Sequence, residues 1–483
     1  MTAVLDRRQL MLGAAGTLLA GSLGATVAAP APARFVAGKR VLEILGKAAP
    51  VLGLDTGMGP VARFGKGDRF AVTLDNRLDE PTLVHWHGLT PPSAQDGVPD
   101  LSQPALPPGA SYAYDFPLTR SGTFWMHSHA GFQRAQLLAA PLIVADPQDK
   151  AADRQEVVIF LADFSFRAPE EVFAGLTGGH GGMKGMAGMD HSHMNHGQMD
   201  HAHMDHSAMP GGMSMDVNDI DFDAYLANDR TLADPEIVRV EPGGRVRLRV
   251  INGAAATNFW LDLGALTGEL IAVDGDPVVP VKAKRFPIAM AQRLDIALTL
   301  PPGQGAYPIL ALREGAKESS GVVLATTGAK IAKLGLSGAT ATKPIGPDFE
   351  QRLTAAQPLP RRKLNRRLAA ELTGDMMSYA WGINGNRYGE DTPLRVKAGE
   401  RVEIAMENRT AMAHPMHLHG HHFQVVAING RRLAGAVRDT VLVPAMGAVS
   451  IAFDADNPGK WAFHCHNEYH MAAGMMTSVQ YES

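Results

Sequence analysis

The chain has 483 residues, a formal net charge of −4 at pH 7, and 45% hydrophobic against 19% charged residues. Its length allows about three domains of roughly 150 residues each, and its composition is that of a globular protein with a sizeable core, which excludes a disordered chain and a membrane bundle. A charge so close to balance gives no reason to expect nucleic acid or an anionic membrane as a partner. There is one cysteine, so no intramolecular disulfide can form, while 19 histidines and 23 methionines cluster along the sequence.

Residues 1–33 are predicted to be an export signal. Arg7 and Arg8 precede an apolar stretch from Leu10 to Leu23, and small residues follow it. The apolar stretch is shorter than the ~20 residues that span a bilayer, which argues against a membrane anchor. The paired arginines resemble a twin-arginine signal. We therefore expect export by that route and no membrane span in the mature protein.

A strand motif that occurs three times predicts the fold. Each copy opens with a glycine, alternates polar and apolar residues, and has an arginine and an asparagine seven residues apart; the copies are 67–76, 244–252 and 399–408. Such alternation is typical of a half-buried strand, and short strands with frequent Gly/Pro turns favour β-sandwiches. The prediction is an all-β chain of three consecutive sandwiches: domain 1 at 40–150, domain 2 at 151–335, a linker at 336–360, and domain 3 at 361–483.

At equivalent positions of this repeat, histidine pairs separated by one residue occur only in the outer copies. Nine and eleven residues after the asparagine of the motif, domains 1 and 3 have a His-x-His-Gly sequence, where domain 2 has Leu261 and Leu263. A second His-x-His follows a glycine and an aromatic strand in both outer domains. The eight histidines are His85, His87, His127, His129, His417, His419, His464 and His466. The two imidazoles of such a pair share one face of a strand, so the four pairs could converge between domains 1 and 3, and eight imidazoles suit copper better than calcium, magnesium or manganese.

Domain 3 carries four further residues that domain 1 lacks. At the offsets where domain 1 has Thr82, Ser128, Gln133 and Leu138, domain 3 has His414, Cys465, His470 and Met475. Two histidines, a cysteine and a methionine are the ligand set of a blue-copper electron-transfer site. A buried free thiol is the alternative for a lone cysteine, but Cys465 stands between two histidines of the other set. Its backbone would therefore give an electron a short covalent path from one site to the other.

These motifs resemble the four copper motifs of the three-domain multicopper oxidases, a laccase-like family, over essentially all of residues 40–483. The segments that carry the resemblance are His85-Trp86-His87-Gly88, His127-Ser128-His129, His414-Pro415-Met416-His417-Leu418-His419, and His464-Cys465-His466 followed by His470 and Met475. The resemblance implies three cupredoxin-like Greek-key β-sandwiches and four copper ions, which pass single electrons from a substrate to dioxygen and reduce it to water. It assigns His85 and His417 to a type 2 copper, His87, His127, His129, His419, His464 and His466 to a type 3 pair, and His414, Cys465, His470 and Met475 to a type 1 copper.

Within that family the sequence looks closest to the periplasmic copper-tolerance oxidases of bacteria, which implies a periplasmic location. The supporting segments are 127–133 (HSHAGFQ) and 373–376 (TGDM). Asp96 matches an acid that in relatives helps to deliver protons to the copper cluster. Met471 stands where some cuprous-oxidising relatives carry a second proton-relaying carboxylate, so the second proton donor is open, with Glu468 as a substitute candidate.

A tract at 176–215 in domain 2 contains seven histidines and nine methionines among Gly, Asp and Ser. This composition cannot form a packed core, whereas thioether sulfur favours Cu(I) and imidazole binds Cu(II) or Cu(I). The tract is therefore predicted to capture copper, with an inert solvated loop as the alternative. Met412, two residues before His414, is a candidate entry point for a cuprous ion or else a core residue, and Met376 and Met377 are weaker candidates.

Three functions remain open from the sequence. The leading hypothesis is oxidation of Cu(I) to less toxic Cu(II) with dioxygen as the acceptor, by a protein that we expect to be monomeric. A laccase-like oxidase of phenols or Mn(II) is the alternative, and a copper sequestration protein is the third. The intact cysteine-containing ligand set argues against sequestration, because storage needs no blue-copper site. His421 and His422 have no counterparts in domain 1 and are expected to be structural.

Overall fold

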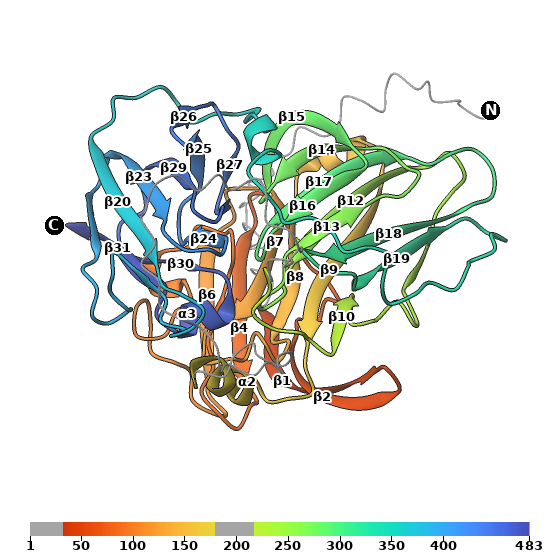
Figure 1. Cartoon of the computed structure of the whole chain (residues 1–483), viewed down its shortest axis with the longest axis horizontal. Coiled ribbons are helices and arrows are strands. Elements are labelled where there is room, and N and C mark those ends of the chain that lie inside the picture. Colours follow the sequence, from red (N-terminus) through yellow and green to blue (C-terminus); the bar gives the residue numbers. More distant parts are fainter. Residues whose placement is uncertain (1–31, 179–216, 483) are drawn as a thin grey trace, which may run out of the picture. The chain divides into compact units, whose positions relative to one another are not determined.

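The computed structural model describes residues 32–178 and 217–482. Nearly all of the expected export signal, and the tract at 176–215 beyond its first three residues, lie outside these ranges. Within them the chain is an all-β fold of three sandwiches, as predicted. Figure 1 shows the strands coloured along the sequence.

The repeated motif forms the same strand three times: β4 (Arg69–Asn76), β12 (Arg245–Asn252) and β23 (Arg401–Asn408). Each has a parallel neighbour on one side and an antiparallel neighbour on the other. The closing asparagine is buried, and its side-chain oxygen accepts the backbone N–H two residues further on. This local bond turns the chain out of the strand, which explains why asparagine recurs at the motif's end.

The first sandwich consists of two four-stranded sheets. One has the order β2 (Lys47–Asp55), β1 (Ala33–Ile44), β4, β6 (Ser111–Pro117), and the other β3 (Ala62–Gly65), β8 (Ala139–Ala145), β7 (Gly122–Ser128), β5 (Val84–His85). Their facing side chains form one hydrophobic core that contains Phe70, Trp86 and Phe124.

The middle sandwich is built from a six-stranded and a five-stranded sheet. The first has the order β10 (Ala224–Ala227), β9 (Gln155–Phe164), β12, β17 (Arg293–Thr299), β14 (Gly268–Val273), β15 (Asp276–Ala283), and the second β11 (Ile237–Arg239), β19 (Ser319–Ala325), β18 (Ala306–Arg313), β13 (Phe259–Asp262), β16 (Arg285–Ile288). Leu261 and Leu263, the counterparts of histidines in the outer domains, are buried in its core. Leucine at these positions therefore serves packing.

The third sandwich repeats the arrangement with a seven-stranded and a five-stranded sheet. The first has the order β21 (Gly382–Ile383), β20 (Arg366–Thr373), β23, β29 (Ala448–Asp454), β25 (Phe423–Ile428), β26 (Arg431–Arg432), with β27 (Val437–Arg438) also paired to β25; the second has β22 (Leu394–Lys397), β31 (Met476–Glu482), β30 (Lys460–Cys465), β24 (His414–Leu418), β28 (Thr440–Val443). Cys465 and Met475 belong to its core.

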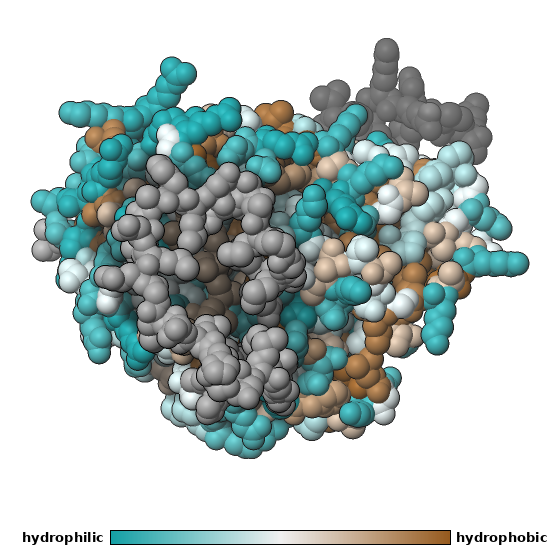
Figure 2. Space-filling model, in the orientation of Figure 1, coloured by the Kyte–Doolittle hydropathy of each residue, from teal (hydrophilic) through white to brown (hydrophobic). Residues whose placement is uncertain are grey.

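Short helices connect the strands: α1 (Pro147–Ala151), α2 (Pro169–Thr177), α3 (Glu468–Ala472), and the 3-10 turns η2 (Ser93–Gln95) and η3 (Glu350–Arg352). Val172 and Leu176 of α2 pack into the core of the third sandwich. None of the helices in the described ranges is long and apolar enough to cross a membrane. Figure 2 shows hydrophilic side chains over much of one face, with smaller hydrophobic areas between them.

Candidate metal centre

The four His-x-His motifs meet between the first and third sandwiches. His85 on β5 lies directly opposite His127 on β7, and His417 on β24 lies directly opposite His464 on β30. The pairing is thus the same in both sandwiches. Trp86 enters the core of the first sandwich, so strand alternation turns the histidines on either side of it away from that core.

The eight histidines form three groups, in each of which one nitrogen per ring lies within 4.8 Å of the others. The groups are His85, His87 and His417; His87, His127 and His466; and His129, His419 and His464. Nε2 of His464 is 3.0 Å from Nε2 of His419 and 3.4 Å from Nε2 of His129. All eight side chains are buried except that of His129, which is half-buried. In each group the ring nitrogens are close enough together to bind one metal ion.

The outward nitrogens of three of these rings, His85, His127 and His464, are fixed by hydrogen bonds to backbone carbonyls. Nδ1 of His85 is 2.8 Å from the Asp96 carbonyl, and Nδ1 of His464 is 2.8 Å from the Cys465 carbonyl. His127 Nδ1 makes the same kind of bond to a backbone carbonyl. A carbonyl only accepts, so Nδ1 carries the proton and Nε2 keeps its lone pair, as metal-binding histidines require.

The ring atoms that face the centre fit copper. Nδ1 of His87, Nε2 of His127 and Nε2 of His466 are buried without a hydrogen-bond partner, which is costly unless a bound group satisfies them. Burial lowers the pKa of His464 to about 3 and holds the pKa of His127 and of His129 well below its usual range. Neutral imidazole is the form that binds a metal ion, and an all-nitrogen donor set suits copper.

A second set lies inside the third sandwich. The sulfur of Cys465 is 3.7 Å from Nδ1 of His414 and 3.8 Å from Nδ1 of His470, and these two nitrogens are 3.1 Å apart. Burial raises the pKa of the Cys465 thiol, and a bound metal would favour the thiolate. Met475 is fully buried in the same core, and its carbonyl accepts the backbone N–H of Cys465. The helix cap Asn467 accepts the backbone N–H groups of Tyr469 and His470, which fixes the start of α3.

Asp96 joins two of the histidine groups. It follows the turn η2, and its side chain is fully buried. Its Oδ2 is 2.8 Å from Nδ1 of His419, and its Oδ1 is 3.3 Å from Nδ1 of His85. The carboxylate therefore lies against the centre, behind ligand candidates from both outer sandwiches.

Glu468, the substitute candidate for a second acid, also lies beside the centre. It is buried on α3 and pairs with the buried Arg134. Arg134 in turn places Nη1 2.8 Å from Nδ1 of His466. Met471 is half-buried and packs in a small separate cluster with Ala462. Glu468 therefore reaches the centre only through Arg134, and Met471 does not contact it.

Asp219 is a buried acid that the sequence did not single out. Its side chain is fully buried, and its Oδ2 lies 2.8 Å from Nε2 of His470. Tyr379 and Asn467 donate to the same oxygen at 2.8 and 2.9 Å, while Oδ1 has no partner. Asp219 lies just beyond the histidine- and methionine-rich tract, in a stretch without periodicity, so only its place in the fold could reveal it.

A cavity of about 80 Å³ opens beside this second set. Asp219, Glu314, Met290 and Met412 are among the residues that line it. Met412 is only 8% exposed. The cavity thus combines carboxylate and thioether groups from the middle and third sandwiches.

The remaining histidine and methionine candidates lie elsewhere. His421 bonds to Tyr481, and His422 bonds to Asp276 and the Gly88 carbonyl, so neither joins a metal-binding group. Met376 packs against the core of the third sandwich, and Met377 is 88% exposed.

Comparison with known proteins agrees with this geometry. Family models described as multicopper oxidase match residues 40–149, 155–331 and 361–483. Multicopper oxidase MmcO of Mycobacterium tuberculosis (strain ATCC 25618 / H37Rv) is 32% identical over 502 aligned positions, which cover 100% of this chain and 90% of the relative. Copper resistance protein A of Escherichia coli is 27% identical, with coverage of 92% and 91%. The crystal structure of a multicopper oxidase from Pseudomonas thermotolerans aligns with a TM-score of 0.66 at 23% identity, over 93% of this chain and 98% of that one.

The chain belongs to the multicopper oxidase family. Its three sandwiches are cupredoxin-like, as predicted. It is an oxidoreductase that binds four copper ions and uses dioxygen and a reductant.

Proposed function

We propose that the protein oxidises Cu(I) at a type 1 copper and passes the electrons to dioxygen at a trinuclear cluster. In this proposal His85 and His417 hold the type 2 copper, His87, His127, His129, His419, His464 and His466 hold the type 3 pair, and His414, Cys465, His470 and Met475 hold the type 1 copper. When bound, copper supplies one-electron oxidation at the type 1 site and four-electron reduction of dioxygen at the cluster.

The observation that carries the proposal is the position of Cys465. Its sulfur faces His414 and His470, while its chain neighbours His464 and His466 belong to two different histidine groups. His464 also hydrogen-bonds the Cys465 carbonyl. An electron that enters at the sulfur therefore has a covalent path of one residue to either side of the type 3 pair.

Acidic side chains support the proton supply that oxygen reduction needs. Asp96 contacts the outer nitrogens of His419 and His85, so it can hold a proton beside the cluster. Glu468 reaches the other side of the cluster through Arg134. We propose Asp96 as the first proton donor and Glu468 as the second.

The cavity beside the type 1 set favours a metal ion over a phenol as the reductant. Its volume of about 80 Å³ has room for a few water molecules. Met290 and Met412 offer thioether sulfur, which prefers Cu(I), and the unpartnered Oδ1 of Asp219 offers a negative charge. The name of the Escherichia coli relative, copper resistance protein A, fits a role in copper tolerance.

The chain at both ends of the histidine- and methionine-rich tract lies near this cavity. At its start, the ring of Phe173 on α2 lies 6.5 Å from that of Tyr379, which donates to the cavity residue Asp219. Just after its end, Asp219 contacts His470. Copper captured by the tract would therefore be released close to the type 1 site. We further propose, from the arginine pair at 7–8, export to the periplasm through the twin-arginine route. The protein is proposed to act as a monomer.

Dioxygen consumption with Cu(I) and with a bulky phenol tests the proposal. Met412→Leu should raise the apparent KM for Cu(I) several-fold and leave turnover of the phenol unchanged. Met406→Leu is the matched control, because Met406 is also buried in the third sandwich but does not line the cavity. If the parent protein consumes oxygen with the phenol but not with Cu(I), the laccase-like alternative takes its place.

A further inference from the structure

Asp439, between β27 and β28, contacts two histidines of one group, His87 and His417, and His87 also belongs to a second group. Its backbone carbonyl is 2.8 Å from Nδ1 of His417, and its carboxylate Oδ1 is 3.0 Å from Nε2 of His87. The guanidinium of Arg293 donates to both oxygens of this carboxyl group, and an arginine that donates to both oxygens pairs with the ionised carboxylate. Both Asp439 oxygens therefore only accept hydrogen bonds.

The two histidines consequently carry their protons on opposite nitrogens. His417 is protonated on Nδ1 and presents Nε2 to the centre, like His85 and His127. His87 is protonated on Nε2, so the atom left to bind a metal ion is Nδ1, which is buried and has no partner. Asp439 thus determines which nitrogen of His87 keeps a lone pair that can bind a metal ion.

Arg293 holds the Asp439 carboxylate in place. It is fully buried on β17 of the middle sandwich, and all five of its N–H groups are used. Nη1 donates to Oδ1 of Asp439 at 2.8 Å and to the Ala291 carbonyl at 3.0 Å, Nη2 donates to Oδ2 of Asp439 and to the Asp274 carbonyl, and Nε donates to the Thr123 carbonyl at 3.1 Å. One side chain thereby joins the first, middle and third sandwiches.

The residue after His87 is a glycine, and the ion pair of Arg293 and Asp439 lies directly against it. A Cβ atom on Gly88 would lie 2.6 Å from Nη2 of Arg293 and 2.9 Å from Oδ2 of Asp439, and Gly88 has a φ of +89°. Only a residue without a side chain lets the backbone beside His87 approach so closely.

We propose that Arg293 is a positioning residue of the trinuclear cluster: through Asp439 it selects Nδ1 of His87 as the atom that binds a type 3 copper. The proposal rests on the ligand assignment made above. The middle sandwich has Leu261 and Leu263 where the outer sandwiches have histidines. The proposal nevertheless gives it a role in the cluster, because its arginine determines how a ligand of the first sandwich is presented. A purely structural ion pair is the competing explanation.

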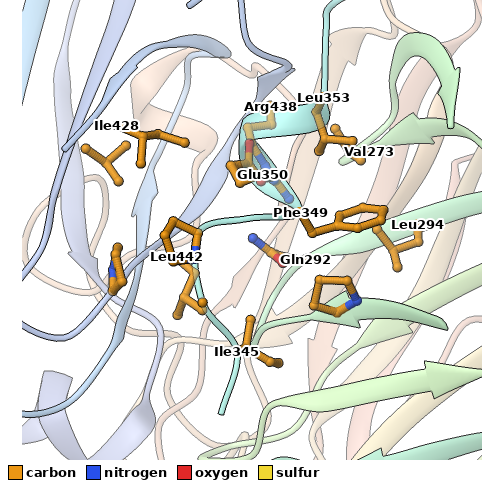
Figure 3. A pocket seen from close by; sticks show the side chains of 15 residues that line it. Val273, Gln292, Leu294, Ile345, Phe349, Glu350, Leu353, Ile428, Arg438 and Leu442 are labelled. Atoms are coloured by element: carbon orange, nitrogen blue, oxygen red, sulfur yellow. Dashed lines mark hydrogen bonds and ion pairs between the residues drawn. The ribbon is translucent and has the colours of Figure 1, made fainter. Parts of the chain in front are cut away.

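Arg438 provides a matched control for that explanation. It is as deeply buried as Arg293, and it pairs with Asp274 at 2.9 Å and with Glu350. Figure 3 shows Arg438 and Glu350 together beside a small cavity at the same junction of the middle and third sandwiches. Its described hydrogen bonds reach no histidine.

The test compares Arg293→Met, Arg293→Lys and Arg438→Met by two measurements. Ring ¹⁵N NMR of the copper-free protein, assigned with a His87→Gln variant, reports the tautomer of His87. Electron paramagnetic resonance of the copper-loaded protein reports the fraction of copper that is uncoupled, since a coupled type 3 pair gives no signal. Arg293→Met should shift His87 away from the Nε2–H tautomer and raise the detectable copper above half of the total while the blue colour remains. Arg438→Met should change neither, and Arg293→Lys should restore most of the coupled pair.

Two results would overturn the proposal. In one, Arg293→Met keeps the parent tautomer and the parent signal; in the other, Arg438→Met loses the coupled pair as fully as Arg293→Met does. If Arg293→Met does not fold, Asp439→Ala is measured in its place, because it removes the oxygen that accepts from Nε2 of His87. It should give the same shift of tautomer and the same rise in detectable copper, and the parent tautomer in this variant would overturn the proposal. If the parent protein itself gives no type 3 pair, the ligand assignment fails, and the tautomer measurement still shows separately whether Arg293 positions His87.

Discussion

Replacing Asp219 by asparagine should raise the reduction potential of the type 1 copper. The contacts from His470, Tyr379 and Asn467 all reach Oδ2, whereas Oδ1 has no partner. An asparagine can therefore keep its oxygen at the position of Oδ2 and place its nitrogen at the position of Oδ1. The shape and the three contacts are retained, and only the negative charge is lost.

The size of the shift follows from the position of the carboxylate. Oδ2 lies 2.8 Å from one ring nitrogen of His470, and the other nitrogen faces the type 1 set, so one imidazole ring separates the two charges. Coulomb's law at a separation of about 7 Å and an effective dielectric constant of ~20 then gives about 2.4 kcal/mol. At ~59 mV per tenfold change for a one-electron couple, this corresponds to roughly 100 mV. The carboxylate stabilises the more positive oxidised copper, so its loss raises the potential.

Redox titration of the blue absorption band measures this shift directly. Tyr379→Phe is the control, because it removes a donor to Asp219 and leaves the charge in place, and it should shift the potential by much less. A potential in Asp219→Asn that stays the same or falls, with the blue band intact, would show that the carboxylate does not act on the type 1 copper as an electrostatic neighbour.

Three further variants test the electron path, the proton supply and the tract. Cys465→Ser should abolish the blue band and oxidase turnover while much of the cluster copper remains; retained turnover with a phenol would contradict the proposed electron path. Asp96→Ala should slow oxygen reduction more than reduction of the blue copper, because only the cluster consumes protons, and an unchanged oxygen step in stopped-flow experiments would remove Asp96 from the mechanism. Deleting residues 180–215 should raise the apparent KM for Cu(I) and leave phenol turnover equal or improved, because a tethered binding segment raises local concentration. If oxidation at limiting Cu(I) is unaffected, the tract does not supply substrate.

The fold could be predicted because the sequence motif that specifies each sandwich is local and occurs three times. Asn76 and its two counterparts end equivalent strands with the same side-chain bond, so a comparison of the three copies aligns the sandwiches without any long-range information. The same alignment locates the His-x-His motifs on paired strands, such as His85 opposite His127. Strand alternation then sets the direction in which they point.

The residues behind the ligand candidates could not be found in this way. Asp219, Asp439 and Arg293 come from positions without a repeated pattern, and they meet the histidines only when the sandwiches pack together. The sequence also does not show which ring nitrogen either histidine of a pair presents. Which ring nitrogen each presents depends on the acceptor that the fold places behind it, and this is why His87 differs from His85.

Each histidine group combines side chains from two sandwiches. In the proposed ligand assignment, copper would therefore crosslink distant segments, such as His85 and His417, which are 332 residues apart in the chain. Metal that binds the folded arrangement and not the unfolded chain stabilises it by mass action, by about 2.7 kcal/mol when free copper is about 100 times its dissociation constant. The first and third sandwiches should consequently unfold together in the copper-loaded protein and become separable when copper is removed. Whether the first and third sandwiches unfold cooperatively thus depends on the bound copper as well as on the sequence.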